Sequence, residues 1–246
     1  MIFDDGIIET NYGLKREGKS FFLIIAPHAA GDDLKTALIS AQLAKSLNGF
    51  LLINNKYFKK NNHRSIDQPD LIADFNKLTW SYRQYKYLWQ RKTPALKTFF
   101  ADIGLYCKQA RTYHPEQKAV AIYIHGMKDK KTGIDIGVGL KTIRGNNKFI
   151  NSAKAQNKNS GLITIKISQL KKIKSILQKA LEKDYQLKVS VGKKHIGWSK
   201  QSAIQWHKHE GRDDYALQLE INSSLRKPIN REYLINLITL ALTKTF

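Results

Sequence analysis

The sequence predicts an α/β fold built on a mixed, largely parallel central sheet. Several short runs are apolar almost without interruption, which is typical of strands covered on both faces. Amphipathic helical patterns separate some of these runs, and this alternation is typical of α/β domains. The chain has 246 residues, 42% of them hydrophobic and 10% aromatic. We therefore expect a single domain over residues 1–246 with a sizeable core.

Six apolar runs are the expected strands. The first run is followed by Pro27, the third ends in His125, and the last one contains Glu220. Their ranges are 21–26, 50–54, 119–125, 161–167, 187–191 and 215–221.

Apolar residues at helical spacing predict three helices. They run from Leu34 to Leu47, from Leu170 to Leu181 and from Leu234 to Leu242. Ser168 is the expected N-cap of the second helix, and Pro228 suits the first turn of the third.

Two segments depart from this pattern. The region of about 126–160 is rich in Gly, Lys and Asn, so we expect a long loop with one short strand at 134–140. Residues 151–200 hold twelve lysines and two acids, which makes this segment the densest basic region. The whole chain carries a formal charge of +22 and has a pI near 9.9. Such a charge attracts a polyanion, an anionic lipid or an acidic substrate, without deciding among them.

Other features narrow the class of protein. No stretch approaches the roughly 18 unbroken apolar residues that a membrane span needs. The first residues, "MIFDDGIIET", lack the basic and long apolar parts of a signal peptide. The single cysteine, Cys107, has no partner for an internal disulfide. We therefore expect a cytoplasmic protein without a membrane partner.

The candidate functional residues follow three of the expected strands. In open α/β sheets, ligands bind beyond the carboxyl ends of the strands. The first strand leads into His28 and the third ends at His125, while the last one delivers Glu220. Two aspartates, Asp32 and Asp33, come shortly after His28.

Taken singly, each of these residues has an ordinary structural explanation. An aspartate before a helix is most often an N-cap, and a histidine at a strand end often satisfies a turn or a sheet edge. Glu220 could pair with Arg226 or with a lysine. Taken together, two imidazoles, one carboxylate ligand and one free carboxylate are what a hydrolytic zinc site requires. The free carboxylate would act as the general base, and a cation near the substrate carbonyl would stabilise the oxyanion.

Four segments resemble the N-formylglutamate amidohydrolase family and, more distantly, the poly-γ-glutamate hydrolases and zinc carboxypeptidases. They occur in the family's order and span most of the chain. They are "APHAAGDDLKTA" (26–37), "DLIADFNKL" (70–78), "AIYIHGM" (121–127) and "YALQLEINSSLRK" (215–227). The resemblance implies a three-layer α/β/α fold of the zinc-carboxypeptidase type.

The resemblance also implies roles for individual residues. His28 and His125 would be zinc ligands, and Glu220 would be the catalytic base. Asp33 would be the third ligand, because it lies five residues after His28 and three before a threonine, as a glutamate does in the poly-γ-glutamate hydrolases. Asp32 is the competing choice. Asn76 would help to hold a carboxylate of the substrate.

Two departures from the family pattern affect the expected substrate site. The third ligand is an aspartate where the poly-γ-glutamate hydrolases have a glutamate. Lys77 stands where the family has an arginine, so a bidentate contact to a carboxylate is lost. Arg144 is the preferred source of the missing guanidinium and of the catalytic cation, with Arg64 as a second source and Arg212 as a weaker third.

The sequence therefore predicts a zinc-dependent amidohydrolase. Its substrate would be a small acidic or acylated amino acid or a glutamyl peptide. One alternative is a nucleic-acid-binding protein, favoured by the charge and by the interleaved aromatic and basic residues of "WSYRQYKYLWQRK" (80–92). The other is a member that keeps the fold and the metal without catalysis. His207 and His209, in a polar stretch, are expected to be exposed.

Overall fold

The central strands of the sheet run parallel and the outer ones make it mixed. The computed structural model describes residues 6–31, 33, 35–58, 74–76, 93–139, 162–193, 197, 202–209 and 211–246. Its eight-stranded sheet has the order β1-β2-β4-β3-β5-β8-β6-β7. The inner strands β4, β3, β5 and β8 are parallel, whereas β2 and β6 pair antiparallel with β4 and β8. The predicted mixed, largely parallel sheet is confirmed.

The bounds of the elements are as follows. The strands are β1 (Ile7–Glu9), β2 (Gly13–Arg16), β3 (Phe22–Ala26), β4 (Phe50–Asn54), β5 (Val120–Met127), β6 (Thr132–Gly137), β7 (Lys188–Val191) and β8 (Tyr215–Asn222). The helices are α1 (Thr36–Ser46), α2 (Pro94–Tyr113), α3 (Ile167–Tyr185), α4 (Pro228–Thr243) and the 3-10 helix η3 (Ala203–Lys208).

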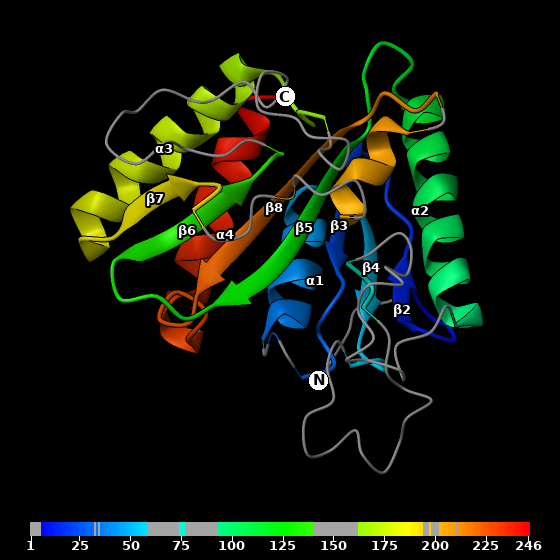
Figure 1. Ribbon diagram of the computed structural model, residues 1–246, viewed down its shortest axis with the longest axis horizontal. Helices are drawn as coiled ribbons and strands as arrows, with labels where there is room; N and C mark the ends of the chain where they lie inside the picture. The colour runs from blue at the N-terminus through cyan, green and yellow to red at the C-terminus, as the bar shows by residue number, and fades with distance from the viewer. Residues whose placement is uncertain are drawn as a thin grey trace.

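Helices cover both faces of the sheet, so the fold has three layers (Figure 1). Alternate residues of a strand point to opposite faces. In β5, Ile122 and Ile124 pack with α1, α3 and α4, whereas Ala121 and Tyr123 pack with α2 and η3. Burial on both sides explains why these strands are continuously apolar in sequence.

The parallel strands bring their carboxyl ends to one edge of the sheet. β5 lies between β3 and β8, and its His125 is in register with Glu220 of β8. His28 follows the end of β3 after a single proline. The topology therefore gathers the candidate residues from three neighbouring strands at this edge.

One predicted strand is wrong. Residues 162–166 form no strand, and α3 begins at Ile167, so Ser168 lies inside the helix and does not cap it. Lys166 is the N-cap residue, and its N–H donates to Oε1 of Gln169 at 2.9 Å. The isoleucines that suggested a strand pack against the core without pairing in the sheet.

The sequence patterns missed β1, β2 and α2. The two strands are short and carry polar residues, so they lack the apolar signal of the inner strands. α2 begins in the usual way, with Pro94 in its first turn and Oγ1 of Thr93 accepting from the N–H of Leu96 at 3.1 Å. The expected long loop of about 126–160 starts with the end of β5 and contains β6, while residues 140–161 lie outside the described part of the chain.

Candidate metal centre

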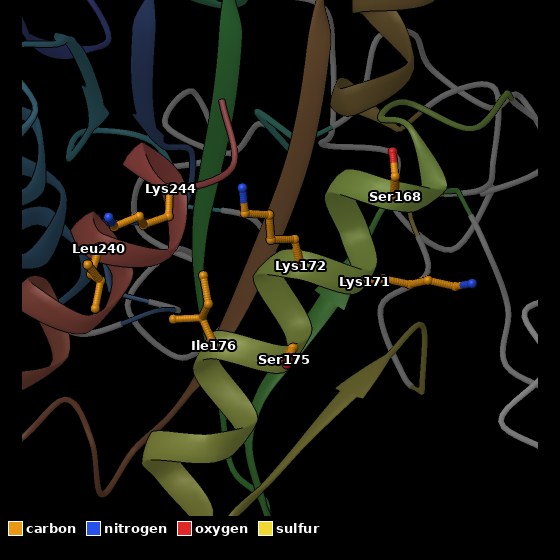
Figure 2. Close-up of a pocket in the computed structure, with 7 residues that line it drawn as sticks. All are labelled: Ser168, Lys171, Lys172, Ser175, Ile176, Leu240 and Lys244. Carbon is orange, nitrogen blue, oxygen red and sulfur yellow. The ribbon is translucent and has the colours of Figure 1, made fainter.

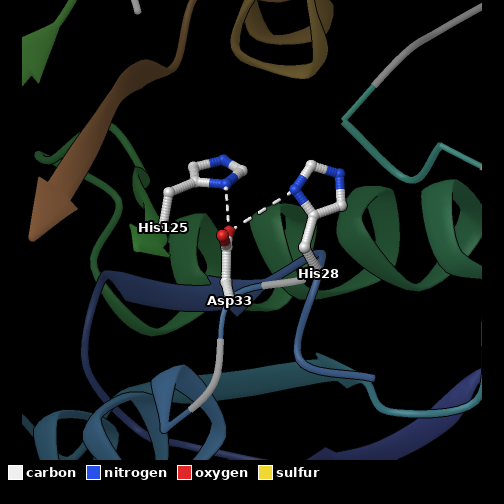
Figure 3. Close-up of side chains that lie close together, drawn as sticks. All are labelled: His28, Asp33 and His125. Carbon is white, nitrogen blue, oxygen red and sulfur yellow. Dashed lines mark hydrogen bonds and ion pairs between the residues drawn. The ribbon is translucent and has the colours of Figure 1, made fainter. Parts of the chain in front are cut away.

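Three buried side chains meet at the carboxyl edge of the sheet (Figure 3). His28 follows β3, His125 lies near the end of β5, and Asp33 belongs to the turn before α1. Their exposed fractions are only 1%, 3% and 8%. In Figure 3 the Asp33 carboxylate rises between the two imidazole rings.

The spacing of these side chains fits a metal ion. Oδ2 of Asp33 lies 3.1 Å from Nδ1 of His125 and 3.5 Å from Nδ1 of His28. Zinc bonds to nitrogen and oxygen of about 2.0–2.2 Å in a tetrahedron place neighbouring ligand atoms about 3.3–3.5 Å apart. The three donors therefore need only small movements to hold such an ion. Imidazole and carboxylate are also the ligand types that suit Zn²⁺.

The turn after β3 sets the position of Asp33. The N–H of Asp33 donates to the carbonyl of His28 at 3.2 Å, and the carbonyl of Asp33 accepts from Oγ1 of Thr36 at 2.7 Å. The N-cap position of α1 is Lys35, which has a left-handed backbone and no capping side chain. The carboxylate of Asp33 thus faces the histidines and does not cap the helix.

The two histidines keep the carboxyl group of Asp33 ionised. Burial alone raises the pKa of this carboxyl group, but the contacts with His125 and His28 outweigh burial. The net pKa of Asp33 lies far below its ordinary value, so the group is an anion ready to bind a cation.

Asp74 orients His28, a role that the sequence analysis did not assign. Its Oδ1 lies 2.9 Å from Nε2 of His28, on the side of the ring away from Asp33. The same oxygen accepts from the N–H of Asn76 at 3.0 Å, and the fully buried Phe75 holds the segment in the core. A carboxylate on the far nitrogen of a histidine fixes the tautomer whose other nitrogen binds metal. Asp74 stands in the "DLIADFNKL" segment, but its contact with His28 spans 46 residues and has no local signal.

Glu220 is a second carboxylate beside the histidines. It is 3% exposed and in register with His125 on the neighbouring parallel strand. On the other side, Asp135 of β6 is opposite Glu220, but it accepts from Oγ of Ser190 and the N–H of Lys193. Glu220 is therefore the carboxylate in register with a candidate metal ligand.

A buried arginine lies next to this group. A Cβ atom on Gly126 would be 2.6 Å from Cζ of Arg226, so the missing side chain makes room for the guanidinium. Burial lowers the pKa of Arg226, and the nearby charges of Asp33 and Glu220 raise it. From the sequence alone, Arg226 was only a possible partner of Glu220. The turn after β8, which brings Arg226 back against Gly126 of β5, has no signal in the sequence.

The remaining predicted residues fall into two groups. Asn76 lies beside Asp74 in the described structure, and its Oδ1 accepts no hydrogen bond there. Arg212 stacks on the ring of Trp206 at 4.0 Å and donates to the carbonyl of His209. Four others lie outside the described residues, namely Asp32, Arg64, Lys77 and Arg144.

The expectation that His207 is exposed is wrong. This histidine is fully buried in η3, where it meets Tyr123 and Cys107. Lys208 ends the same short helix and His209 follows it, and this run of polar residues suggested a loop. His209, which was also expected to be exposed, is half-buried.

Part of the basic charge gathers in a separate groove between α3 and α4 (Figure 2). The groove has a volume of about 740 Å³ and combines apolar Ile176 and Leu240 with Lys171, Lys172 and Lys244. The interleaved segment 80–92 lies outside the described residues. None of the described helices is long and apolar enough to cross a lipid bilayer.

Comparison with known proteins gives structural matches only. No family model matches the sequence, and no curated protein matches it. The fold is similar to gene product Atu2144 from Agrobacterium tumefaciens, with a TM-score of 0.51, 11% identity, and coverage of 92% of this chain and 91% of that one. It is also similar to YNDL in a zinc-free apo form, with a TM-score of 0.50, 13% identity, and coverage of 98% and 90%.

A third solved structure carries a functional name. It is N-formylglutamate amidohydrolase from Ralstonia eutropha JMP134, with a TM-score of 0.50, 13% identity, and coverage of 93% of each chain. These matches span nearly the whole of each chain at very low identity. The chain therefore has the carboxypeptidase-like α/β/α fold that N-formylglutamate amidohydrolase also has.

Proposed function

We propose that this protein is a metal-dependent hydrolase that cleaves the amide bond of an N-acyl amino acid or a glutamyl peptide. The observation that carries the proposal is the convergence of His28, Asp33 and His125, whose donor atoms are spaced for one ion. The shared fold with N-formylglutamate amidohydrolase supports the same reaction class.

The three convergent side chains would hold Zn²⁺. When bound, zinc supplies a Lewis acid that polarises the substrate carbonyl and acidifies a water molecule. His28 would bind through Nδ1, because its Nε2 is engaged with Asp74. Asp33 and His125 would complete the set and leave a position open, as catalytic zinc sites do.

Glu220 is the proposed general base. Its place beside His125 suits a carboxylate that removes a proton from water and delivers it to the leaving nitrogen. The oxyanion on the substrate carbonyl needs a cation, for which we retain Arg144 as the proposed residue. The alternative cation is Arg226, whose guanidinium interacts electrostatically with Asp33 and Glu220.

The net charge of +22 favours an anionic substrate. Asn76 would bind the substrate carboxylate by donating from the N–H groups of its amide, because a carboxylate can only accept. Lys77 and Arg64 are proposed to supply the cationic contacts of the same subsite.

The variant Glu220→Gln tests the proposed function. Hydrolysis of N-formylglutamate and of a short γ-glutamyl peptide is measured for zinc-loaded wild type and variant, together with zinc content. We expect the variant to keep its zinc and to lose about 10²–10⁴-fold in kcat, because the shape is kept and the base is removed. Glu182→Gln, on the outer part of α3, is the matched control and should behave like wild type. Full activity of Glu220→Gln would place the base elsewhere.

A further inference from the structure

A second group of buried donors lies on the α2 face of the sheet. Cys107 comes from α2, His207 from η3 and Asp214 from the residue before β8. Their exposed fractions are 1%, 0% and 2%. Asp214, just before β8, precedes Glu220 by six residues, or about 20 Å of extended chain. The group therefore has no part in the hydrolytic site.

The donor atoms are close enough for one ion. Sγ of Cys107 lies 3.9 Å from Nδ1 of His207, and one atom from each of the three residues lies within 4.8 Å of the others. Zinc bonds of about 2.3 Å to sulfur and 2.0 Å to nitrogen place these two atoms about 3.5 Å apart in a tetrahedron. To reach that geometry, the sulfur and nitrogen would approach by about 0.4 Å and the oxygen of Asp214 by up to about 1.5 Å.

The hydrogen bonds of His207 leave its Nδ1 available. The hydroxyl of Tyr123 lies 3.4 Å from the carbonyl of Ala203 and 3.0 Å from Nε2 of His207. A carbonyl can only accept, so the contact with Ala203 uses the hydroxyl proton; in the tautomer that matches it, His207 carries its proton on Nε2 and donates it to Tyr123. Nδ1 then carries the lone pair and faces the sulfur.

Asp214 has one engaged and one unengaged oxygen. Nη1 of Arg111 donates to Oδ1 at 2.5 Å. Oδ2 is buried, and the group that interacts with this carboxylate besides Arg111 is the Cys107 thiol. A thiol is a weak hydrogen-bond donor, and an ion that replaces its proton would satisfy the buried oxygen better.

Other uses of these residues fit less well. Cys107 is 1% exposed, so its thiol is enclosed by the core. An enclosed thiol cannot reach a substrate and is a poor nucleophile. The chain has no second cysteine, so an internal disulfide is excluded.

We propose that Cys107, His207 and Asp214 bind a structural Zn²⁺ ion that joins α2, η3 and the start of β8. On binding, the thiol releases its proton to solvent and sulfur, Nδ1 and Oδ2 become the ligands, with the fourth position taken by water. The thiolate would supply one negative charge to the ion, and the charge of Asp214 would be shared between the ion and Arg111. The inference is independent of the proposed hydrolase activity, because the two sites share no residue.

Cobalt substitution tests the proposal on the unmodified chain. A thiolate bound to Co²⁺ gives an intense near-ultraviolet charge-transfer band, which nitrogen and oxygen ligands do not give. Cys107 is the only cysteine, so such a band in folded protein reports this site alone. We expect the band, together with two cobalt ions per chain. Folded wild type without the band at saturating Co²⁺ would overturn the proposal.

Variants separate the two sites. Asp214→Asn keeps the thiol and should weaken cobalt binding in this band at least tenfold, whereas Asp213→Asn, the neighbouring exposed carboxylate, should not. His125→Ala should keep the band and lose the other ion. A band of unchanged affinity in Asp214→Asn would remove Asp214 from the ligand set and overturn the site as proposed. Loss of activity with the band intact would concern only the hydrolytic site.

Discussion

Asp33 is the central residue of the candidate metal centre, because its carboxylate contacts both His28 and His125. Its Oδ2 lies within 3.5 Å of a nitrogen from each ring, and the turn between β3 and α1 fixes its backbone through His28 and Thr36. A short side chain suffices at this position because the turn itself approaches β5.

Asp74 should control the affinity for zinc without being a ligand. Asp74→Asn keeps the size of the side chain and removes the charge that orients His28. We expect zinc to bind about 10–100-fold more weakly, as measured by competition with a chromogenic chelator. Asp213→Asn should bind like wild type. Equal affinities for all three proteins would show that Asp74 does not support the ligand.

The buried His207 should make the metal-free protein sensitive to acid. Its folded pKa of about 3 lies below the ordinary value of about 6.5, so the unfolded chain takes up a proton that the folded chain refuses. The contribution of His207 to the free energy of unfolding is therefore complete above pH 6.5 and is lost as the pH falls towards 3, by about 5 kcal/mol.

The measurement is urea unfolding of chelator-treated protein between pH 7 and 4. His207→Gln has no titrating imidazole and should show a shallower loss of stability over this range than wild type. Parallel curves for the two proteins would contradict the buried, neutral state of His207.

At the residue scale, candidate site residues at strand ends could be predicted from the sequence. Residues that reach their partners through long-range contacts could not. His28, Asp33, His125 and Glu220 were predictable because each stands where an apolar run ends or turns. In the structure His28, Asp33 and His125 lie close together and Glu220 is in register with His125, while the roles of all four residues stay a prediction. Asp74, Arg226 and His207 depend on contacts between distant segments, for which the sequence holds no local signal.

Among the elements, the register between β5 and β8 matters most for the site. Because parallel strands align residue for residue, the pairing of β5 with β8 sets His125 and Glu220 side by side. The inner strands were predictable from their apolar runs. The helix α2 was not predicted, although the N-cap Thr93 followed by Pro94 is a recognisable signal for the start of a helix.

Two glycine substitutions should have opposite effects on stability. Gly104 lies inside α2, and a Cβ there would meet Trp206 at an ordinary 3.4 Å, so Gly104→Ala should stabilise by about 0.5–1 kcal/mol. A Cβ on Gly18 would lie 2.2 Å from the backbone carbon of Gly49, so Gly18→Ala should destabilise by about 2 kcal/mol or more. Urea unfolding gives both values. A destabilised Gly104→Ala would mean that Trp206 packs more tightly than this contact implies.

Over the whole molecule, the net charge of +22 produces a long-range positive field, and its lysines extend well beyond the candidate metal centre. Three lysines line the groove between α3 and α4, and others lie along the outer face of α3. A field of this kind raises the local concentration of anions and is screened by salt.

The field should appear as a salt dependence of KM. For an anionic N-acylglutamate, KM should rise roughly 2- to 10-fold between 20 and 300 mM salt, with a smaller change in kcat. An uncharged N-acyl amide of similar size is the matched substrate and should show little change. Equal salt dependence for both substrates would mean that the charge of the protein does not attract the substrate.

Zinc content measured in the Cys107→Ser background tests the central claim most directly. This change removes the sulfur ligand of the second site, so only His28, Asp33 and His125 should hold metal. We predict one zinc ion per chain in Cys107→Ser and none when His125→Ala is added, with both proteins folded by circular dichroism. Zinc absent from Cys107→Ser, or retained after His125→Ala, would contradict the metal centre at the end of β3 and β5.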